Sequence, residues 1–109
     1  MLDAIKVIRD VIQGLDLATY EAPQSVGQRR AVERCIEIVS EASRHLPIDL
    51  IDQHPEVPWR AIRDIGNVLR HGYAHVDNKM IWKVASSDVL DLEPALHRIL
   101  ASLPLDPED

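Results

Sequence analysis

The chain has 109 residues, of which 46% are hydrophobic and only 4% are aromatic, with no Phe. This length fits one domain, and the apolar content suffices for a folded core of aliphatic side chains. The formal net charge of -6 excludes broad, non-specific binding of nucleic acid but not a local cationic site. The single cysteine, Cys35, excludes an internal disulfide, and no apolar run is long enough to cross a bilayer, so we expect a cytoplasmic protein.

The N-terminal part of the chain predicts one helix followed by an irregular segment. Apolar residues with helical spacing predict a helix over residues 2–13, and Gly14 ends it. Residues 15–24 are expected to form a loop or a short helix that is broken near Pro23.

A longer helix is predicted over residues 25–46, with Ser25 as its N-cap and Pro47 after its end. Its polar face carries regularly spaced acids among arginines, which is typical of a solvated face with ion pairs. The alternative is that one Glu orients a catalytic group on a neighbouring helix. The expected buried stripe consists of Val32, Cys35, Ile36, Val39 and Leu46. The residues of the polar face are Arg30, Glu33, Arg34, Glu37, Glu41 and Arg44.

The middle of the chain predicts one turn, one long helix and one short helix. Residues 48–55 have room for a single turn, and a helix is expected to begin at Pro58 and to weaken at Gly72. The short helix is predicted over residues 78–85, with Asp77 as its N-cap.

The last helix is predicted over residues 92–103, with Pro94 in its first turn and residues 86–91 as the connection before it. No segment alternates convincingly as a strand would. The chain therefore predicts an all-α fold, an up-and-down bundle of four to five helices over residues 1–104. Residues 105–109 are expected to form an acidic tail.

Polar residues gather at the end of the helix that begins near residue 58. Asn67 and His71 are one helical turn apart, Arg63 lies one further turn back, Arg70 directly precedes His71, and Tyr73 follows it by two. His can move a proton near neutral pH, Asn can hold a substrate oxygen, and Arg can neutralise a phosphate. These residues are therefore candidates for a catalytic site. The alternative is a polar outer face with a His that caps the helix.

A metal site is the less favoured interpretation of the same segment. His71 and His75 have the spacing of helical zinc ligands, but Gly72 lies between them and a third ligand such as Asp77 has to be assumed. We expect no metal and no cofactor.

Three blocks of the chain point to a known family. They are Arg-Ala-Val-Glu-Arg-Cys-Ile-Glu-Ile-Val-Ser-Glu-Ala-Ser-Arg-His-Leu-Pro at residues 30–47, His-Pro-Glu-Val-Pro-Trp-Arg at 54–60, and Asn-Val-Leu-Arg-His-Gly-Tyr at 67–73. Their order and spacing resemble the HepT-like ribonuclease toxins of the HEPN superfamily, which are small, all-helical prokaryotic proteins. The resemblance covers nearly the whole chain, to about residue 103.

The resemblance implies a function, an assembly and a partner. It implies a homodimer in which two His-bearing helices meet across a cleft, and metal-independent RNA cleavage by attack of the 2′-hydroxyl on the phosphate. His71 would be the acid–base group, and Asn67 would support the phosphate. Tyr73 would be the residue to which an MNT-type nucleotidyltransferase, the antitoxin, adds AMP to silence the toxin.

The chain departs from the family at one position. Where the family most often has Arg, five residues before His71, this chain has Gly66. Arg70 or Arg63 would then supply the missing charge, and Gly66→Arg is expected to raise activity provided that the side chain fits. The alternative is an inactive dimer that serves as an interaction partner of a nucleotidyltransferase. An unrelated helical adaptor is a third and less favoured interpretation.

Overall fold

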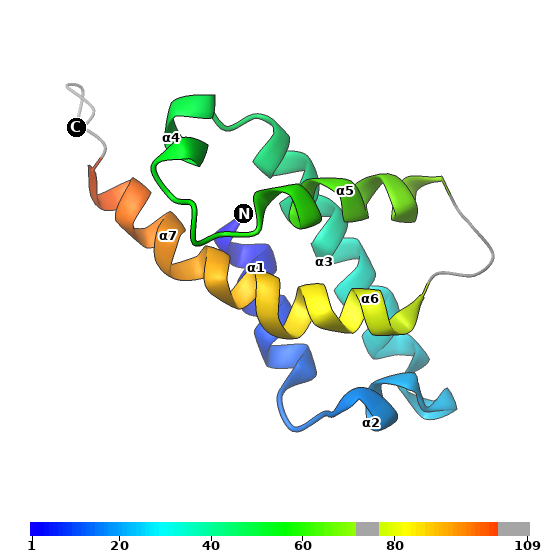
Figure 1. The fold of residues 1–109 in the computed structure, drawn as a ribbon. Coiled ribbons are helices and arrows are strands. Elements are labelled where there is room, and N and C mark those ends of the chain that lie inside the picture. The colour runs from blue at the N-terminus through cyan, green and yellow to red at the C-terminus, as the bar shows by residue number, and fades with distance from the viewer. Residues whose placement is uncertain (72–76, 103–109) are drawn as a thin grey trace.

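The computed structural model describes residues 1–71 and 77–102, which contain helices and no strand (Figure 1). This confirms the predicted all-α bundle. No helix within these two ranges has both the length and the apolar character that a membrane span requires. The long helices are α1 (Leu2–Ile12), α3 (Val26–Arg44), α5 (Trp59–Arg70) and α7 (Val89–Ser102). The shorter elements are α2 (Leu17–Glu21), η1 (Pro23–Ser25), α4 (Ile48–Asp52), α6 (Asn78–Lys83) and η2 (Val84–Asp88).

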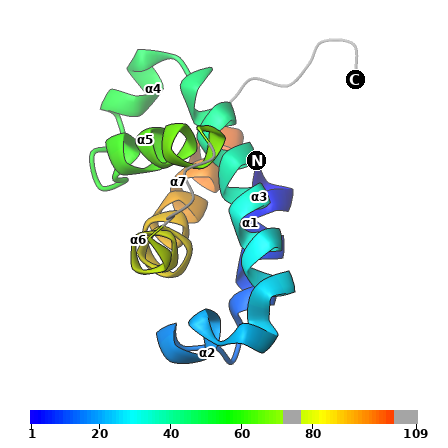
Figure 2. The ribbon, with the colours of Figure 1, turned by 90° about the vertical axis from the view of Figure 1, so that its right-hand side faces the viewer.

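Helix α3 is the centre of the bundle because it packs against both α1 and α5. Helices α1 and α3 pack along each other, and Figure 2 shows α5 and α6 to the left of this pair. Helix α6, η2 and α7 follow one another as a single rod that crosses below α5 in Figure 1. The position of α5, which carries the candidate site residues, is therefore set mainly by its contact with α3.

The core is aliphatic, as the composition predicts. On α3 the buried stripe consists of Val32, Ile36 and Val39, while Cys35 is half-buried and packs against the core. Burial raises the pKa of the Cys35 thiol, as expected for a packing residue rather than a nucleophile. The fully buried side chains of the other elements include Ile5, Ile8, Tyr20, Ile62, Ile81, Val89 and Leu92.

Tyr20 is the one tyrosine within residues 1–71 and 77–102, and it is inaccessible. Its ring packs on Trp82, with 5.2 Å between the ring centroids. The hydroxyl is buried without a hydrogen-bond partner in the described part of the chain. Burial and the nearby carboxylate of Glu33 raise the pKa of Tyr20 to about 12.

The N-terminal caps differ partly from the prediction. Asp77 caps α6 as expected, by accepting a hydrogen bond from the Lys79 amide at 2.9 Å. Ser25 does occupy the N-cap position of α3, but its hydroxyl donates to the Thr19 carbonyl at 2.7 Å instead of capping the helix. The segment predicted as a loop or short helix forms α2, which a capping box between Asp16 and Thr19 begins.

The predicted connection over residues 86–91 is wrong, as is the start of the last helix. Residues 84–88 form a π-helical turn that continues directly into α7, so Pro94 lies inside that helix rather than in its first turn. Within the helical rod, Ser86 donates to the Trp82 carbonyl at 2.6 Å and Asp88 pairs with Lys83 at 3.2 Å. Core packing therefore outweighs weak helix propensity here.

Helices α3 and α5 approach closely at Gly66. A Cβ placed on this glycine would lie 2.2 Å from the Ser40 Oγ and 2.8 Å from the Ser40 Cβ, so no side chain fits without a shift of the helices. Ser40 is fully buried, and its hydroxyl donates to the Arg63 carbonyl at 3.0 Å. Gly66 thus allows a close contact that fixes α5 on α3.

We predict that Gly66→Ala destabilises the fold. Overpacking of this kind typically costs about 1–3 kcal/mol, which exceeds the gain in helix propensity from replacing Gly. Urea unfolding followed by circular dichroism measures the effect. Gly27→Ala is the matched control, because nothing lies within 4 Å of its added Cβ. This control should be neutral or stabilising by up to about 1 kcal/mol.

The Ser40→Gly background identifies the cause of the loss. It removes both atoms that the new Cβ would meet, so Gly66→Ala should cost less there than in the wild-type chain. An equal cost in both backgrounds would contradict the packing explanation.

Candidate functional site

Polar side chains of α3 and α5 form a hydrogen-bonded cluster at the surface where the two helices meet. The Asn67 Oδ1 accepts hydrogen bonds from Arg44 at 2.7 Å and from Arg70 at 2.5 Å. Arg70 also pairs with Glu41 at 2.7 Å, and Arg44 donates to the Arg63 carbonyl at 3.1 Å. We call Glu41, Arg44, Asn67 and Arg70 the guanidinium cluster.

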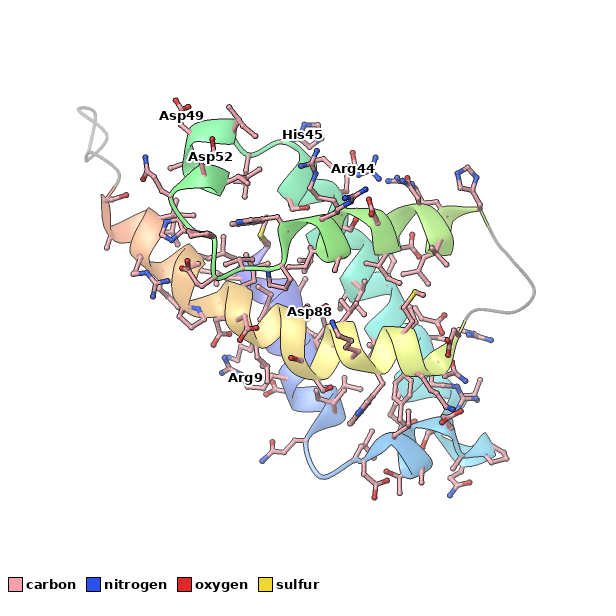
Figure 3. The ribbon with its side chains drawn as sticks, viewed as in Figure 1. Arg9, Arg44, His45, Asp49, Asp52 and Asp88 are labelled. Carbon is pink, nitrogen blue, oxygen red and sulfur yellow. The ribbon has the colours of Figure 1, made fainter. Side chains whose placement is uncertain are left out.

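Helical spacing and the contact at Gly66 together explain this arrangement. Glu41 and Arg44 are three residues apart on α3, as are Asn67 and Arg70 on α5, so each pair shares one helix face. The close approach of the helices brings the two faces within hydrogen-bonding distance. Figure 3 shows Arg44 and His45 leaving α3 at its border with α5.

The cluster concentrates positive charge in an acidic chain. Two guanidinium groups share the neutral oxygen of Asn67, and within the described residues Glu41 is the only carboxylate that pairs with either of them. Hydrogen bonds with His45 and Arg70 lower the pKa of Glu41, so it stays ionised. Because Arg70 is 37% exposed and Glu41 53% exposed, an anion from solvent can compete with Glu41 for Arg70.

His71 directly follows the cluster as the C-cap residue of α5. Its backbone N–H donates to the Asn67 carbonyl at 3.2 Å, and the residue is exposed. The structure therefore brings the predicted site residues Asn67, Arg70 and His71 together at one end of α5. His71 thus offers an imidazole one residue after Arg70, and imidazole is a group that can move protons near neutral pH.

Arg63 occupies a different place from the other predicted site residues. Its carbonyl accepts hydrogen bonds from Ser40 and Arg44, but its side chain lines a neighbouring hollow of about 650 Å³. Arg44, Arg60 and Asp64 line the same hollow. Of the two proposed replacements for the family Arg, Arg70 is thus in the cluster and Arg63 borders it.

An arginine at position 66 does not fit this structure. Gly66 is buried against Ser40, and even a single Cβ atom would collide there. Gly66→Arg was expected to raise activity only if the new side chain fits, and it does not fit here. Gly66 faces the α3–α5 contact, and the guanidinium groups of Arg44 and Arg70 bond the side chain of the next residue, Asn67.

Arg44 was expected on a solvated face of its helix, and its place in the cluster was not predicted. Ion pairs do form on that face, but at i, i+3 rather than the expected i, i+4 spacing, between Arg30 and Glu33 at 3.0 Å and between Arg34 and Glu37 at 3.6 Å. Arg44 looks the same in sequence, because only the packing of α3 on α5 distinguishes it. The contact of Glu41 with Arg70 agrees with the alternative in which a Glu of this helix orients a group on its neighbour.

Several predicted features fall outside the described residues. These include Tyr73, His75 and the acidic tail over residues 105–109. In the ranges 1–71 and 77–102, no three His, Cys, Asp or Glu side chains are grouped as they would be to hold a metal ion.

The comparisons with known proteins agree with one another. The pattern of the family described as ribonuclease HepT-like matches residues 1–99. A protein of Thermococcus cleftensis named as a probable ribonuclease HepT is 36% identical over 69 residues, which are 63% of this chain and 63% of that protein. A candidate RNase of Methanocaldococcus jannaschii is 33% identical over 90 residues, 82% of this chain and 83% of that protein.

Another candidate RNase of the same archaeon is 24% identical over 104 residues, which are 94% of this chain and 90% of that protein. No solved structure gives a significant match. The family pattern covers α1, α3 and α5 and all but the last residues of α7. The chain therefore belongs to the ribonuclease HepT-like family.

Proposed function

We propose that this chain is an endoribonuclease that binds an RNA phosphate at the guanidinium cluster, and that it acts as the toxin of a toxin–antitoxin pair. One observation carries the proposal. Arg44 and Arg70, from two different helices, converge on the Asn67 side chain one turn before His71. Two such cations on one neutral oxygen suit the charge of a phosphate in its transition state.

The reaction uses the 2′-hydroxyl of the RNA as its nucleophile. A base removes the proton of the hydroxyl, the oxygen attacks the adjacent phosphorus, and the bond to the 5′-oxygen breaks as an acid protonates that oxygen. The products carry a 2′,3′-cyclic phosphate and a 5′-hydroxyl. Arg44 and Arg70 neutralise the charge on the pentavalent phosphorus, Asn67 holds both guanidinium groups, and His71 transfers protons. This scheme needs no metal ion.

A homodimer supplies one His71 from each copy, so that one imidazole serves as base and the other as acid. The outer face of α3 offers a surface for such a contact. A hollow of about 620 Å³ there is lined by the apolar Ile38 and Ala42 and by charges of both signs, including Arg34 and Glu37. A face with both signs can pair with itself about a two-fold axis.

A nucleotidyltransferase of the MNT type is the proposed antitoxin, and Tyr73 is the proposed site to which it adds AMP. The added phosphate would place negative charge and bulk two residues after His71, where it would repel an RNA backbone. The burial of Tyr20 supports this assignment, because its hydroxyl is inaccessible to a modifying enzyme.

A second function is favoured by the contact at Gly66. Because this position cannot hold the family Arg, a dimer that binds the nucleotidyltransferase without cleaving RNA is the competing proposal. Both functions share the fold, the dimer and the partner. RNA cleavage by the pure protein distinguishes them.

We predict that the pure protein cleaves RNA in the presence of a chelator and that His71→Ala abolishes this activity. Arg44→Ala or Arg70→Ala should each lower kcat/KM by about two to three decades, since one lost charge contact costs on the order of 2–4 kcal/mol in the transition state. Arg30→Ala is the matched control, because its guanidinium pairs with Glu33 on the same helix. Cleavage is followed by gel electrophoresis of a labelled oligonucleotide.

A substrate with 2′-deoxyribose at the cleaved position should resist the enzyme, and the products should carry cyclic phosphate ends. Wild-type cleavage that survives the loss of both Arg44 and Arg70 would show that the cluster is not the phosphate site. No wild-type cleavage would favour the non-cleaving partner instead.

We predict that the protein is a dimer in solution, because one chain supplies only one His71. Light scattering coupled to size-exclusion chromatography measures the mass. Ile38→Glu, which places charge on the 40% exposed apolar residue of the α3 face, should weaken the dimer. Val7→Glu is the matched control on α1, at 43% exposure. A monomer at high concentration would contradict the prediction.

We predict a mass gain of one AMP per modified chain after incubation with the nucleotidyltransferase, ATP and magnesium. Intact mass spectrometry detects the gain, and Tyr73→Phe should remove it. Tyr20→Phe is the control, which should be modified as the wild type is. A modification that maps to Tyr20 would overturn the assignment, as would an unmodified chain.

A further inference from the structure

A line of polar residues continues from the guanidinium cluster along α5 toward its N-terminus. Arg60, Arg63, Asn67 and Arg70 are separated by three, four and three residues, so they lie along one face of the helix. The span of ten residues from Arg60 to Arg70 corresponds to about 15 Å along the helix axis. We call these four residues and Arg44 the α5 stripe.

Arg44 contacts the middle of the α5 stripe and borders both the guanidinium cluster and the neighbouring hollow. Its guanidinium donates to Asn67 Oδ1 and to the Arg63 carbonyl, one helical turn apart on α5. The same side chain lines the hollow of about 650 Å³ together with Arg60, Arg63 and Asp64. The hollow and the cluster are thus adjacent parts of one surface.

The cations of the stripe are incompletely neutralised. Within the described residues, neither Arg44 nor Arg63 forms an ion pair with a carboxylate. Arg60 lies 3.8 Å from Asp64, and its side chain is 96% exposed, so this pair is weak. The other carboxylate on the surface is Glu41, which pairs with Arg70 and His45. Four guanidinium groups therefore face two carboxylates in a chain whose net charge is negative.

We propose that a single RNA strand lies along the α5 stripe, with a second phosphate site in the hollow of Arg44, Arg60 and Arg63. This inference rests on the proposed function, which places the cleaved phosphate at the cluster near His71. About 15 Å corresponds to roughly four nucleotides of a stacked strand at about 3.4 Å each. Arg60 and Arg63 are then substrate-binding residues, and they make a longer strand bind more tightly than a dinucleotide.

The test measures binding of a non-cleavable strand. A fluorescent RNA hexanucleotide with 2′-O-methyl groups lacks the attacking hydroxyl, so anisotropy reports its Kd over a series of NaCl concentrations. Each phosphate contact to a single strand contributes about 0.7 to the slope of log K against log salt concentration. The double variant Arg60→Ala/Arg63→Ala should therefore have a slope that is shallower by about 1.4. The gain in affinity from dinucleotide to hexanucleotide should also shrink.

A matched control distinguishes the effect of the stripe on binding from the effect of the net charge. Arg30→Ala/Arg98→Ala changes the net charge by the same amount, but these side chains pair with Glu33 and Glu56 and do not line the hollow. The control should keep the wild-type slope and the wild-type dependence on strand length.

The outcomes distinguish this inference from the proposed function, because cleavage of unmodified RNA is measured in parallel. An active wild type with an unchanged slope in Arg60→Ala/Arg63→Ala overturns the strand path and leaves the nuclease standing. The expected loss of slope without any wild-type cleavage supports the strand path and overturns the nuclease. An equal loss of slope in the control overturns the strand path, as does a wild type that does not bind the hexanucleotide.

Discussion

The close contact of Gly66 with Ser40 is the constraint on which the candidate site depends. It lets the backbones of α3 and α5 approach until the Ser40 hydroxyl bonds the Arg63 carbonyl. At this separation Arg44 reaches across to Asn67, and Glu41 reaches Arg70. A larger residue at position 66 would separate the helices and break these cross-helix bonds together.

The same contact leaves no room for a side chain at position 66, where the family resemblance led us to expect an Arg. Under the proposed function, the charge comes instead from one Arg on α3 and one later on α5. A shared amide oxygen holds both guanidinium groups in place without neutralising them. In a protein with a net charge of -6, such a local excess of positive charge is what distinguishes a binding surface from ordinary solvated helix faces.

Structural features with a local sequence signal form as predicted, whereas features that depend on packing between helices could not be predicted. The helical periodicity around Ile36 and Ile62, and the capping residue Asp77, are local signals, and these helices form as predicted. The polar run Ser86–Ser87–Asp88 also looked local, but buried neighbours such as Val89 keep the chain helical. Propensity is a weak signal beside the burial of an apolar face.

The candidate site also has residues that local sequence places and residues that only packing places. Asn67, Arg70 and His71 are neighbours in sequence, so helical geometry alone brings them together. Arg44 lies more than twenty residues away on another helix, and its pairing with Asn67 follows only from the register of α3 against α5. The lack of space at Gly66 could likewise not be predicted, since the sequence does not show which residue faces a glycine in a helix.

The order of the contacts along the chain has a consequence for folding kinetics. Helix α3 packs on α1, which precedes it, and on α5, which follows it, so the main interfaces join segments that are close in sequence. The connections span residues 13–25 and 45–58, and because the entropy of loop closure grows only slowly with length, chains with such local contacts fold fast. All residues of the α5 stripe lie between Arg44 and Arg70. On a ribosome, the surface proposed to bind RNA is thus complete in sequence before α7 has been synthesised.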